Sequence, residues 1–132
     1  MQRGGTILNP RLAAAVVGLG HGQTIVVCDA GLPIPAGALI LDLSLVAGVP
    51  GFLQTLEVLA GTLAVEQVIV ARELEQVNAE MQRRVAALWP GVPLRQVSHA
   101  ELKALVGDAR LVVRTGECSP YANAILVGGV TF

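Results

Sequence analysis

Residues 18–35 read Gly18-Leu19-Gly20-His21-Gly22-Gln23-Thr24-Ile25-Val26-Val27-Cys28-Asp29-Ala30-Gly31-Leu32-Pro33-Ile34-Pro35. After Thr24 the middle of this stretch is apolar, as expected for a strand buried in a parallel sheet. Two prolines and Gly31 then stop the strand, because proline donates no hydrogen bond to a ladder. Asp29 therefore lies where a strand gives way to a loop, the usual position of ligand contacts in an α/β fold. Flanking glycines expose the His21 imidazole, and we expect this acid-base group and the Asp29 carboxylate to be delivered to one end of the strand.

Strands alternate with helices along the rest of the chain. The hydrophobic pattern predicts strands at residues 24–28, 39–43, 65–71, 93–97, 111–114 and 124–127, and helices at residues 10–17, 52–59 and 73–89 and after Ser98. Asn9 and Ser98 are suitable caps for the helices that they precede. This alternation predicts an α/β fold, a single-domain sandwich over residues 1–132 with a largely parallel sheet flanked by helices.

The composition limits the class of protein. Of the 132 residues, 53% are hydrophobic, yet no run approaches the ~18–20 apolar residues of a membrane span, and the start does not resemble a signal peptide. We therefore expect a cytoplasmic protein with no membrane partner. So large an apolar excess in a small chain predicts surface covered by other subunits, hence a homo-oligomer. A net charge of −1 and 3% aromatic residues argue against nucleic acid as a partner.

Three further chemistries are disfavoured by spacing. Cys28 and Cys118 form no Cys-x-x-Cys pair, so both are expected to be reduced, buried thiols. No pair among these cysteines, His21 and His99 has metal-ligand spacing, so no metal site is predicted. The glycines at 18, 20 and 22 follow a helix and precede a strand, which is the reverse of a dinucleotide-binding fingerprint.

Two other segments concentrate polar groups. Ser98 places His99 in the first turn of a helix, with Lys103 on the same face, and residues 115–123 join hydroxyl, carboxylate, phenol and amide groups between two apolar strands. Such a set suits a small polyol. The structural alternatives are that Asp29 caps a turn, that His99 and Lys103 are exposed surface groups, and that residues 115–123 form a turn held by its own side chains.

Several segments together resemble the ribose/fucose mutarotase family. They are Gly20-His21, Val26 to Pro35, Gly48-Val49-Pro50, Ser98-His99 with Lys103, Thr115 to Asn123, and the ending Gly129-Val130-Thr131-Phe132. Members that act on fucose typically have His-Phe-Pro after the Asp-Ala and a Lys-Tyr-Gly-Asn ending, so the chain is more similar to the ribose branch. The resemblance extends over essentially the whole chain.

The resemblance implies a cofactor-free enzyme that interconverts β-D-ribopyranose and β-D-ribofuranose. It implies that His21 is the proton donor, and that the sugar is bound by Asp29, His99, Tyr121, Ala122 and Asn123. It also implies a homodecamer built from rings, with sites near subunit boundaries.

This chemistry suits an imidazole. Ring opening protonates the ring oxygen while the anomeric hydroxyl loses a proton, and an imidazole with an ordinary pKa of ~6.5 exchanges protons at neutral pH. Family members often carry an acidic residue two positions after the histidine, which would support the imidazole, whereas this chain has Gln23. The alternatives to a ribose mutarotase are a fucose-type mutarotase and a non-catalytic sugar-binding protein.

Overall fold

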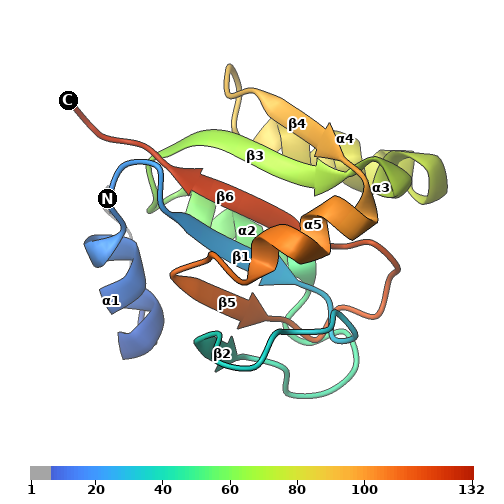
Figure 1. Cartoon of the computed structure of the whole chain (residues 1–132), viewed down its shortest axis with the longest axis horizontal. Coiled ribbons are helices and arrows are strands. Elements are labelled where there is room, and N and C mark those ends of the chain that lie inside the picture. The colour runs from blue at the N-terminus through green and yellow to red at the C-terminus, as the bar shows by residue number, and fades with distance from the viewer. Residues whose placement is uncertain (1–6) are drawn as a thin grey trace.

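The computed structural model describes residues 7–132, which form a six-stranded sheet with helices on both faces (Figure 1). The elements are α1 (Pro10–Gly18), β1 (Thr24–Cys28), β2 (Ile40–Asp42), α2 (Phe52–Ala60), β3 (Val65–Ala71), α3 (Arg72–Val77), α4 (Ala79–Leu88), β4 (Leu94–Val97), α5 (His99–Val106), β5 (Leu111–Arg114) and β6 (Ala124–Gly128). The strand order is β2-β5-β1-β6-β3-β4. Only the pairings of β6 with β1 and β3 are antiparallel within this sheet, so the predicted largely parallel α/β sandwich is confirmed.

The central strand β1 is buried on both faces, as its apolar run predicted. Ile25 and Val27 belong to a hydrophobic cluster that also contains residues of α1, α2 and α4. Val26 and Cys28 point to the opposite face and join a second cluster with Leu102 of α5. Because successive strand residues face opposite sides, one short apolar run fills the middle of both layers. Figure 1 shows α5 in front of the sheet and α2 behind it.

The strands at residues 24–28, 65–71 and 111–114 have the predicted bounds, but the helix predicted at residues 73–89 is wrong as a single element. It is divided into α3 and α4 at Asn78, whose backbone is not helical (φ −148°, ψ 73°). The Asn78 side chain accepts a hydrogen bond from the Met81 N–H at 3.1 Å and so caps α4. Asparagine competes with helix continuation in this way because its short side chain reaches nearby backbone groups.

The topology gives the sheet two different edges. The parallel strands all end at one edge, where the antiparallel β6 begins, so the segments after β1, β4 and β5 meet there. At the opposite edge lie the turn that precedes β1, the end of β6 and the chain end marked C (Figure 1). We call the edge where the parallel strands end the carboxyl edge, and the opposite edge the amino edge. Within residues 7–132 no helix is long and apolar enough to cross a bilayer.

Candidate functional site

The loop at residues 115–123 is fastened to the carboxyl end of β1. The backbone N–H and the hydroxyl of Thr115 both donate to the Cys28 carbonyl, at 3.0 and 2.7 Å. The Ala30 N–H donates to the Glu117 carbonyl at 2.8 Å. The loop therefore lies alongside the segment that follows β1, and the two segments form facing walls.

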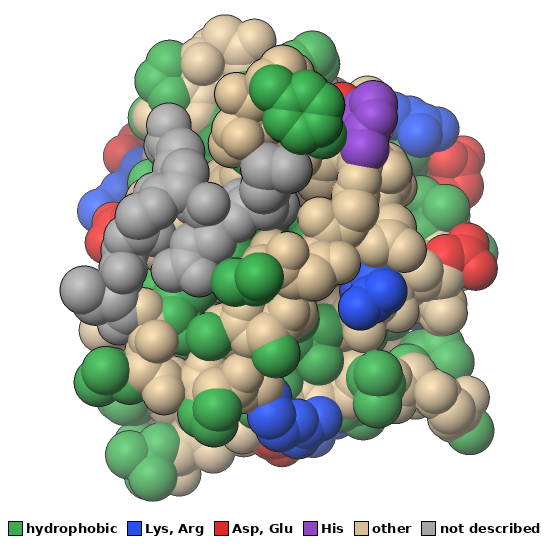
Figure 2. All heavy atoms as spheres, turned by 90° about the vertical axis from the view of Figure 1, so that its left-hand side faces the viewer, with side chains coloured by type: hydrophobic (Ala, Val, Ile, Leu, Met, Phe, Trp, Pro, Cys, Tyr) green, Lys and Arg blue, Asp and Glu red, His purple; other side chains and the backbone are tan. Residues whose placement is uncertain are grey.

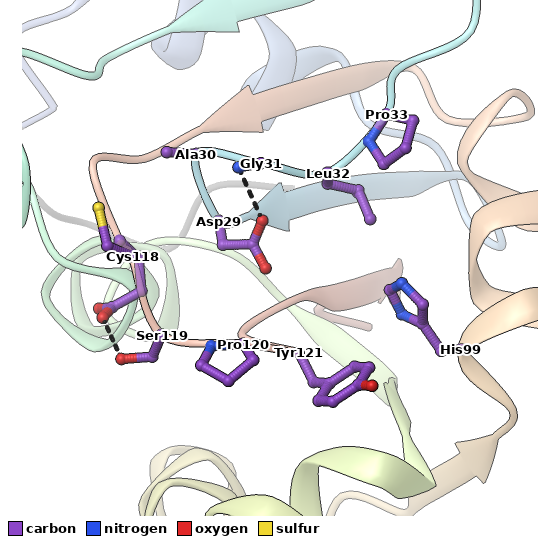
Figure 3. Close-up of a pocket in the computed structure, with 11 residues that line it drawn as sticks. Asp29, Ala30, Gly31, Leu32, Pro33, His99, Cys118, Ser119, Pro120 and Tyr121 are labelled. Atoms are coloured by element: carbon purple, nitrogen blue, oxygen red, sulfur yellow. Dashed lines mark hydrogen bonds between the residues drawn. The ribbon is translucent and has the colours of Figure 1, made fainter.

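These walls enclose a cavity of about 550 Å³ at the carboxyl edge (Figure 3). The lining residues are Asp29, Ala30, Gly31, Leu32 and Pro33 on one side, Glu117, Cys118, Ser119, Pro120 and Tyr121 on the other, and His99 from the start of α5. The volume is in the range of small-molecule sites, and the polar groups that sequence analysis singled out in three separate segments converge here.

Asp29 is held at both its backbone and its side chain. One carboxylate oxygen accepts from the Gly31 N–H at 3.0 Å, so Asp29 caps a turn, as the structural alternative expected. The other oxygen faces the space between the two walls (Figure 3). The Asp29 N–H donates to the side-chain oxygen of Asn123 at 2.9 Å. The oxygen that caps the turn is therefore not the one that faces the cavity.

Asn123 and Ala122 lie behind the cavity wall rather than in it. Both are fully buried, and neither is among the lining residues. Within residues 7–132 the side-chain nitrogen of Asn123 is buried without a hydrogen-bond partner. The hydrogen bond that its side-chain oxygen accepts is from the Asp29 N–H, so this side chain positions the residue that carries the carboxylate.

His99 and Tyr121 stand together at one end of the cavity (Figure 3). Their rings meet edge to face, with centroids 5.0 Å apart and an interplanar angle of 83°. The His99 N–H at the start of α5 donates to the Glu73 carboxylate at 2.9 Å, and the ring nitrogen Nδ1 is buried without a partner. Tyr121 has φ 62°, a left-handed conformation that costs a non-glycine residue ~1–3 kcal/mol and clusters at functional sites.

Glu117 links the cavity loop to α2. Its carboxylate accepts from the Phe52 N–H at 3.0 Å and from the Ser119 hydroxyl at 2.7 Å. Burial alone raises the pKa of Glu117, but the hydrogen bonds from Phe52, Ser119 and Cys118 outweigh burial and hold the pKa below its usual value. A carboxylate at the first residue of a helix also interacts favourably with the helix dipole. The sequence offered no signal for this contact, because its partners are 65 residues apart.

His21 lies at the amino edge, away from this cavity. Strand β1 separates it from Asp29, and at ~3.3 Å per residue the strand alone spans roughly 16 Å. The expectation that both groups are delivered to one end of the strand is therefore wrong within one chain. The His21 side chain is 61% exposed, and Nε2 is 2.7 Å from the Glu66 carboxylate. Figure 2 views this side of the molecule, with a histidine side chain standing at the surface.

The two cysteines differ in their surroundings. Cys28 is buried and reduced, as predicted, and burial, followed by the charge of Asp29, raises its pKa to about 12. Cys118 is also reduced, but the prediction that it is buried is wrong, because it lies in the exposed loop that lines the cavity. Residues 7–132 contain no group of three or more histidine, cysteine or acidic side chains that could hold a metal ion.

An open α/β sheet with a cavity at the carboxyl edge, lined by apolar side chains and a few polar ones, is typical of a small-molecule-binding protein. The chain belongs to the RbsD / FucU transport protein family, whose sequence model matches residues 1–131. D-ribose pyranase 1 of Rubrobacter xylanophilus is 50% identical to it over the full length of both chains. D-ribose pyranase of Bacillus subtilis is 48% identical and covers 96% of each chain. The predicted membership of the ribose/fucose mutarotase family is confirmed.

Solved structures give the same result. The structure of Bacillus subtilis RbsD complexed with D-ribose matches with a TM-score of 0.94 and 47% identity, and covers 100% of both chains. The fucose mutarotase of Streptococcus pneumoniae, solved with L-fucose, matches with a TM-score of 0.76 at 19% identity and covers 95% of both chains, which establishes a shared fold.

Proposed function

We propose that this protein is a D-ribose pyranase, an isomerase that interconverts β-D-ribopyranose and β-D-ribofuranose without a cofactor. The observation that carries the proposal is a cavity at the carboxyl edge, lined by Asp29, His99 and Tyr121, in a chain that matches a ribose-bound relative over its whole length at 47% identity. The full-length D-ribose pyranase relative at 50% identity supports the same activity. At 19% identity, the fucose mutarotase supports the fold and not the substrate.

The cavity provides contacts that suit a sugar. Asp29 offers a carboxylate oxygen that accepts from hydroxyl groups, and Tyr121 offers an aromatic face. His99 Nδ1 has no hydrogen-bond partner among residues 7–132, and an unpaired buried polar atom costs ~1–3 kcal/mol, so a sugar hydroxyl that bonds it removes this cost. In this proposal Asn123 holds Asp29 in place, and sugar contacts of Ala122 and Asn123 stay predictions.

The proposed proton donor, His21, would come from a second copy of the chain. Within one chain β1 separates His21 from the cavity, but a head-to-tail neighbour brings its amino edge against this carboxyl edge. Such a heterologous contact closes into a ring when the rotation permits. Large hydrophobic side chains are exposed near both edges, including Leu45 and Val46 after β2 and Phe132 after β6. The homodecamer and the cytoplasmic location stay predictions.

The reaction then needs only proton transfer and bond rotation. An imidazolium donates a proton to the ring oxygen while a water molecule takes the proton of the anomeric hydroxyl. The bond between C1 and the ring oxygen breaks, and the open-chain aldehyde rotates. Attack by a different hydroxyl closes the other ring size and returns the protons. Positioned acid-base groups typically accelerate such steps by ~10²–10⁴-fold.

The experiment is proton NMR exchange between the anomeric signals of D-ribose, with wild-type protein and with His21→Ala. We expect magnetisation transfer between pyranose and furanose signals with the wild type and its loss in the variant, at an unchanged subunit stoichiometry and melting temperature. L-fucose serves as the comparison substrate. If the wild type shifts the ribose signals without accelerating their exchange, the protein is a sugar-binding module and the proposal is wrong.

A further inference from the structure

The imidazole of His21 is hydrogen-bonded to a residue far along the chain. Its Nε2 is 2.7 Å from Glu66 Oε2, across 45 residues of sequence. A carboxylate only accepts hydrogen bonds, so Nε2 carries the donated proton. In a histidine held in this way the second nitrogen, Nδ1, is the one that exchanges a proton with another molecule.

From this contact we propose that Glu66 is a positioning residue: it fixes the tautomer and orientation of His21 so that Nδ1 is presented for proton transfer to the sugar. The inference rests on the proposed function and adds a residue to it. Sequence analysis did not single out Glu66, because nothing in the local pattern distinguishes a glutamate that faces outward from a strand.

An irregularity in β3 turns Glu66 toward the histidine. The pairing of β3 with β6 shifts between Val65, which opposes Gly128, and Gln67, which opposes Val127. Two steps along β3 thus correspond to one step along β6, and Glu66 is the extra residue. Such bulges re-aim a side chain and are over-represented next to active sites.

Two glycines of β6 and its extension allow the histidine turn and the bulge to approach each other. A Cβ on Gly128 would lie 2.8 Å from the Leu19 side chain and 2.9 Å from the Gly20 carbonyl. A Cβ on Gly129 would lie 3.3 Å from the Cβ of Glu66. A larger residue at Gly128 would therefore push the turn that carries His21 away from β6.

Backbone hydrogen bonds fix the turn on the same strand. The Gly22 N–H donates to the Gly128 carbonyl at 2.9 Å, and the Gly128 N–H donates to the Gln23 carbonyl at 2.8 Å. The turn that carries His21 is bonded to Gly128, and Val65, which precedes Glu66, pairs with the same residue. The backbone therefore holds His21 and Glu66 close together, and their relative position does not depend on the exposed side chains alone.

Gln23 has a different role in this turn. Its side-chain oxygen accepts from the Gly20 N–H at 2.8 Å and closes the turn that carries His21. The acidic partner of the imidazole comes from Glu66 and not from the turn itself.

A merely structural pair would behave differently. The side chains are 61% and 44% exposed, and exposed ion pairs contribute little to stability. A structural role thus predicts that loss of the Glu66 carboxylate changes neither stability nor turnover. A positioning role predicts an unchanged fold with slower turnover, so kcat and the state of the imidazole distinguish the two.

The test compares wild type, Glu66→Gln and Glu66→Ala with Glu57→Ala, an exposed glutamate of α2 that serves as the matched control. Anomeric exchange is measured by NMR over a range of ribose concentrations, and ¹⁵N shifts report the protonated nitrogen of His21. We expect kcat to fall by about ten- to a hundredfold in Glu66→Ala, at or below the lower end of the ~10²–10⁴-fold that an acid-base group supplies, with KM within about twofold. The fall should be smaller in Glu66→Gln, because its amide oxygen can still accept from Nε2. Acetate should partly restore Glu66→Ala, and Glu57→Ala should match the wild type.

Two results would overturn the proposal. One is wild-type kcat in Glu66→Ala, and the other is a His21 tautomer that is the same in the wild type and in Glu66→Ala. If the wild type itself does not accelerate exchange, the proposed function and the catalytic role of Glu66 fail together. The ¹⁵N shifts would then still decide whether Glu66 fixes the imidazole, so the two failures are distinguishable.

Discussion

Replacing Glu117 by glutamine tests how the cavity loop is held to helix α2. The carboxylate accepts from the Phe52 N–H and the Ser119 hydroxyl. Glutamine has nearly the same shape, its oxygen can still accept from Phe52, and its NH₂ group can donate to the hydroxyl. The substitution therefore removes the negative charge and keeps the hydrogen-bond geometry.

The magnitude follows from that charge. A charge-assisted hydrogen bond is roughly twice as strong as a neutral one, and a carboxylate in the first turn of a helix contributes ~0.3–1 kcal/mol. Because Glu117 is only partly buried, solvent screens part of this, and we expect Glu117→Gln to lower the free energy of unfolding by about 1 kcal/mol. For a chain of 132 residues this corresponds to a melting temperature about 3–5 °C lower.

The effect should depend on pH in one direction. Hydrogen bonding lowers the pKa of Glu117 in the folded protein despite burial, so its stabilisation is fully present above the unfolded-state pKa of ~4.3. It is lost as the pH falls through the lower, folded-state value. Asp42 also has a lowered pKa, through its hydrogen bonds with Ser44, but it is present in both proteins and cancels in the difference.

The assay is thermal unfolding followed by circular dichroism at one subunit concentration, from pH 7 to pH 3. We expect the wild type to melt above Glu117→Gln at pH 7 and the gap to close as the pH falls below about 4. A gap that is absent at pH 7, or that is equally large at pH 3, would refute the argument that the charge of Glu117 holds the loop.

Three further predictions concern packing, the cavity and the thiols. Gly128→Ala should destabilise the protein by ~1–3 kcal/mol, because its Cβ would lie 2.8 Å from a leucine side chain. Gly61→Ala is the control, because a Cβ there meets its neighbours at 3.6 Å or more. Urea unfolding measures the stability of both variants. Asn123→Ala should raise KM for ribose several-fold, since it leaves a backbone N–H beside the cavity unpaired, and unchanged KM in the NMR assay would contradict this. Iodoacetamide should modify the exposed Cys118 in the native protein and Cys28 only after unfolding. Peptide mass spectrometry identifies the modified cysteine, and labelling of Cys28 in the native protein would contradict its burial.

The strongest sequence signals were local. The apolar run at residues 24–28, bounded by glycines and prolines, defined the central strand with the bounds that the structure has. Two of the segments that carry the family resemblance, residues 26–35 and 115–123, form the two walls of one cavity. Such segments are predictable because their physical determinants lie within a few residues of each other.

Long-range contacts were not predictable in this way. No spacing connects Glu117 with Phe52, or Glu66 with His21, because each pair meets through the topology of the sheet. The break at Asn78 was missed because asparagine is tolerated within helices and its capping role depends on context.

The prediction that His21 and Asp29 lie together was based on their nearness in sequence, and it was wrong within one chain. His21 and Asp29 flank one strand, and a strand carries its two ends apart, so residues eight positions apart lie at opposite edges of the sheet. This separation supports the proposal that each active site combines the cavity of one subunit with His21 of another.

The most direct test of that claim is complementation between two inactive variants. His21→Ala keeps the cavity and Asp29→Ala keeps the histidine, so each alone should be inactive in the anomeric exchange assay. The two variants are co-expressed with different tags, and mixed oligomers are purified through both. In a randomly assembled ring half of the cavities and half of the neighbouring histidines are intact, so about a quarter of the sites should combine an intact cavity with an intact His21. We predict recovery of up to about a quarter of wild-type exchange. Mixed oligomers as inactive as the separate variants would show that the site is not shared between subunits.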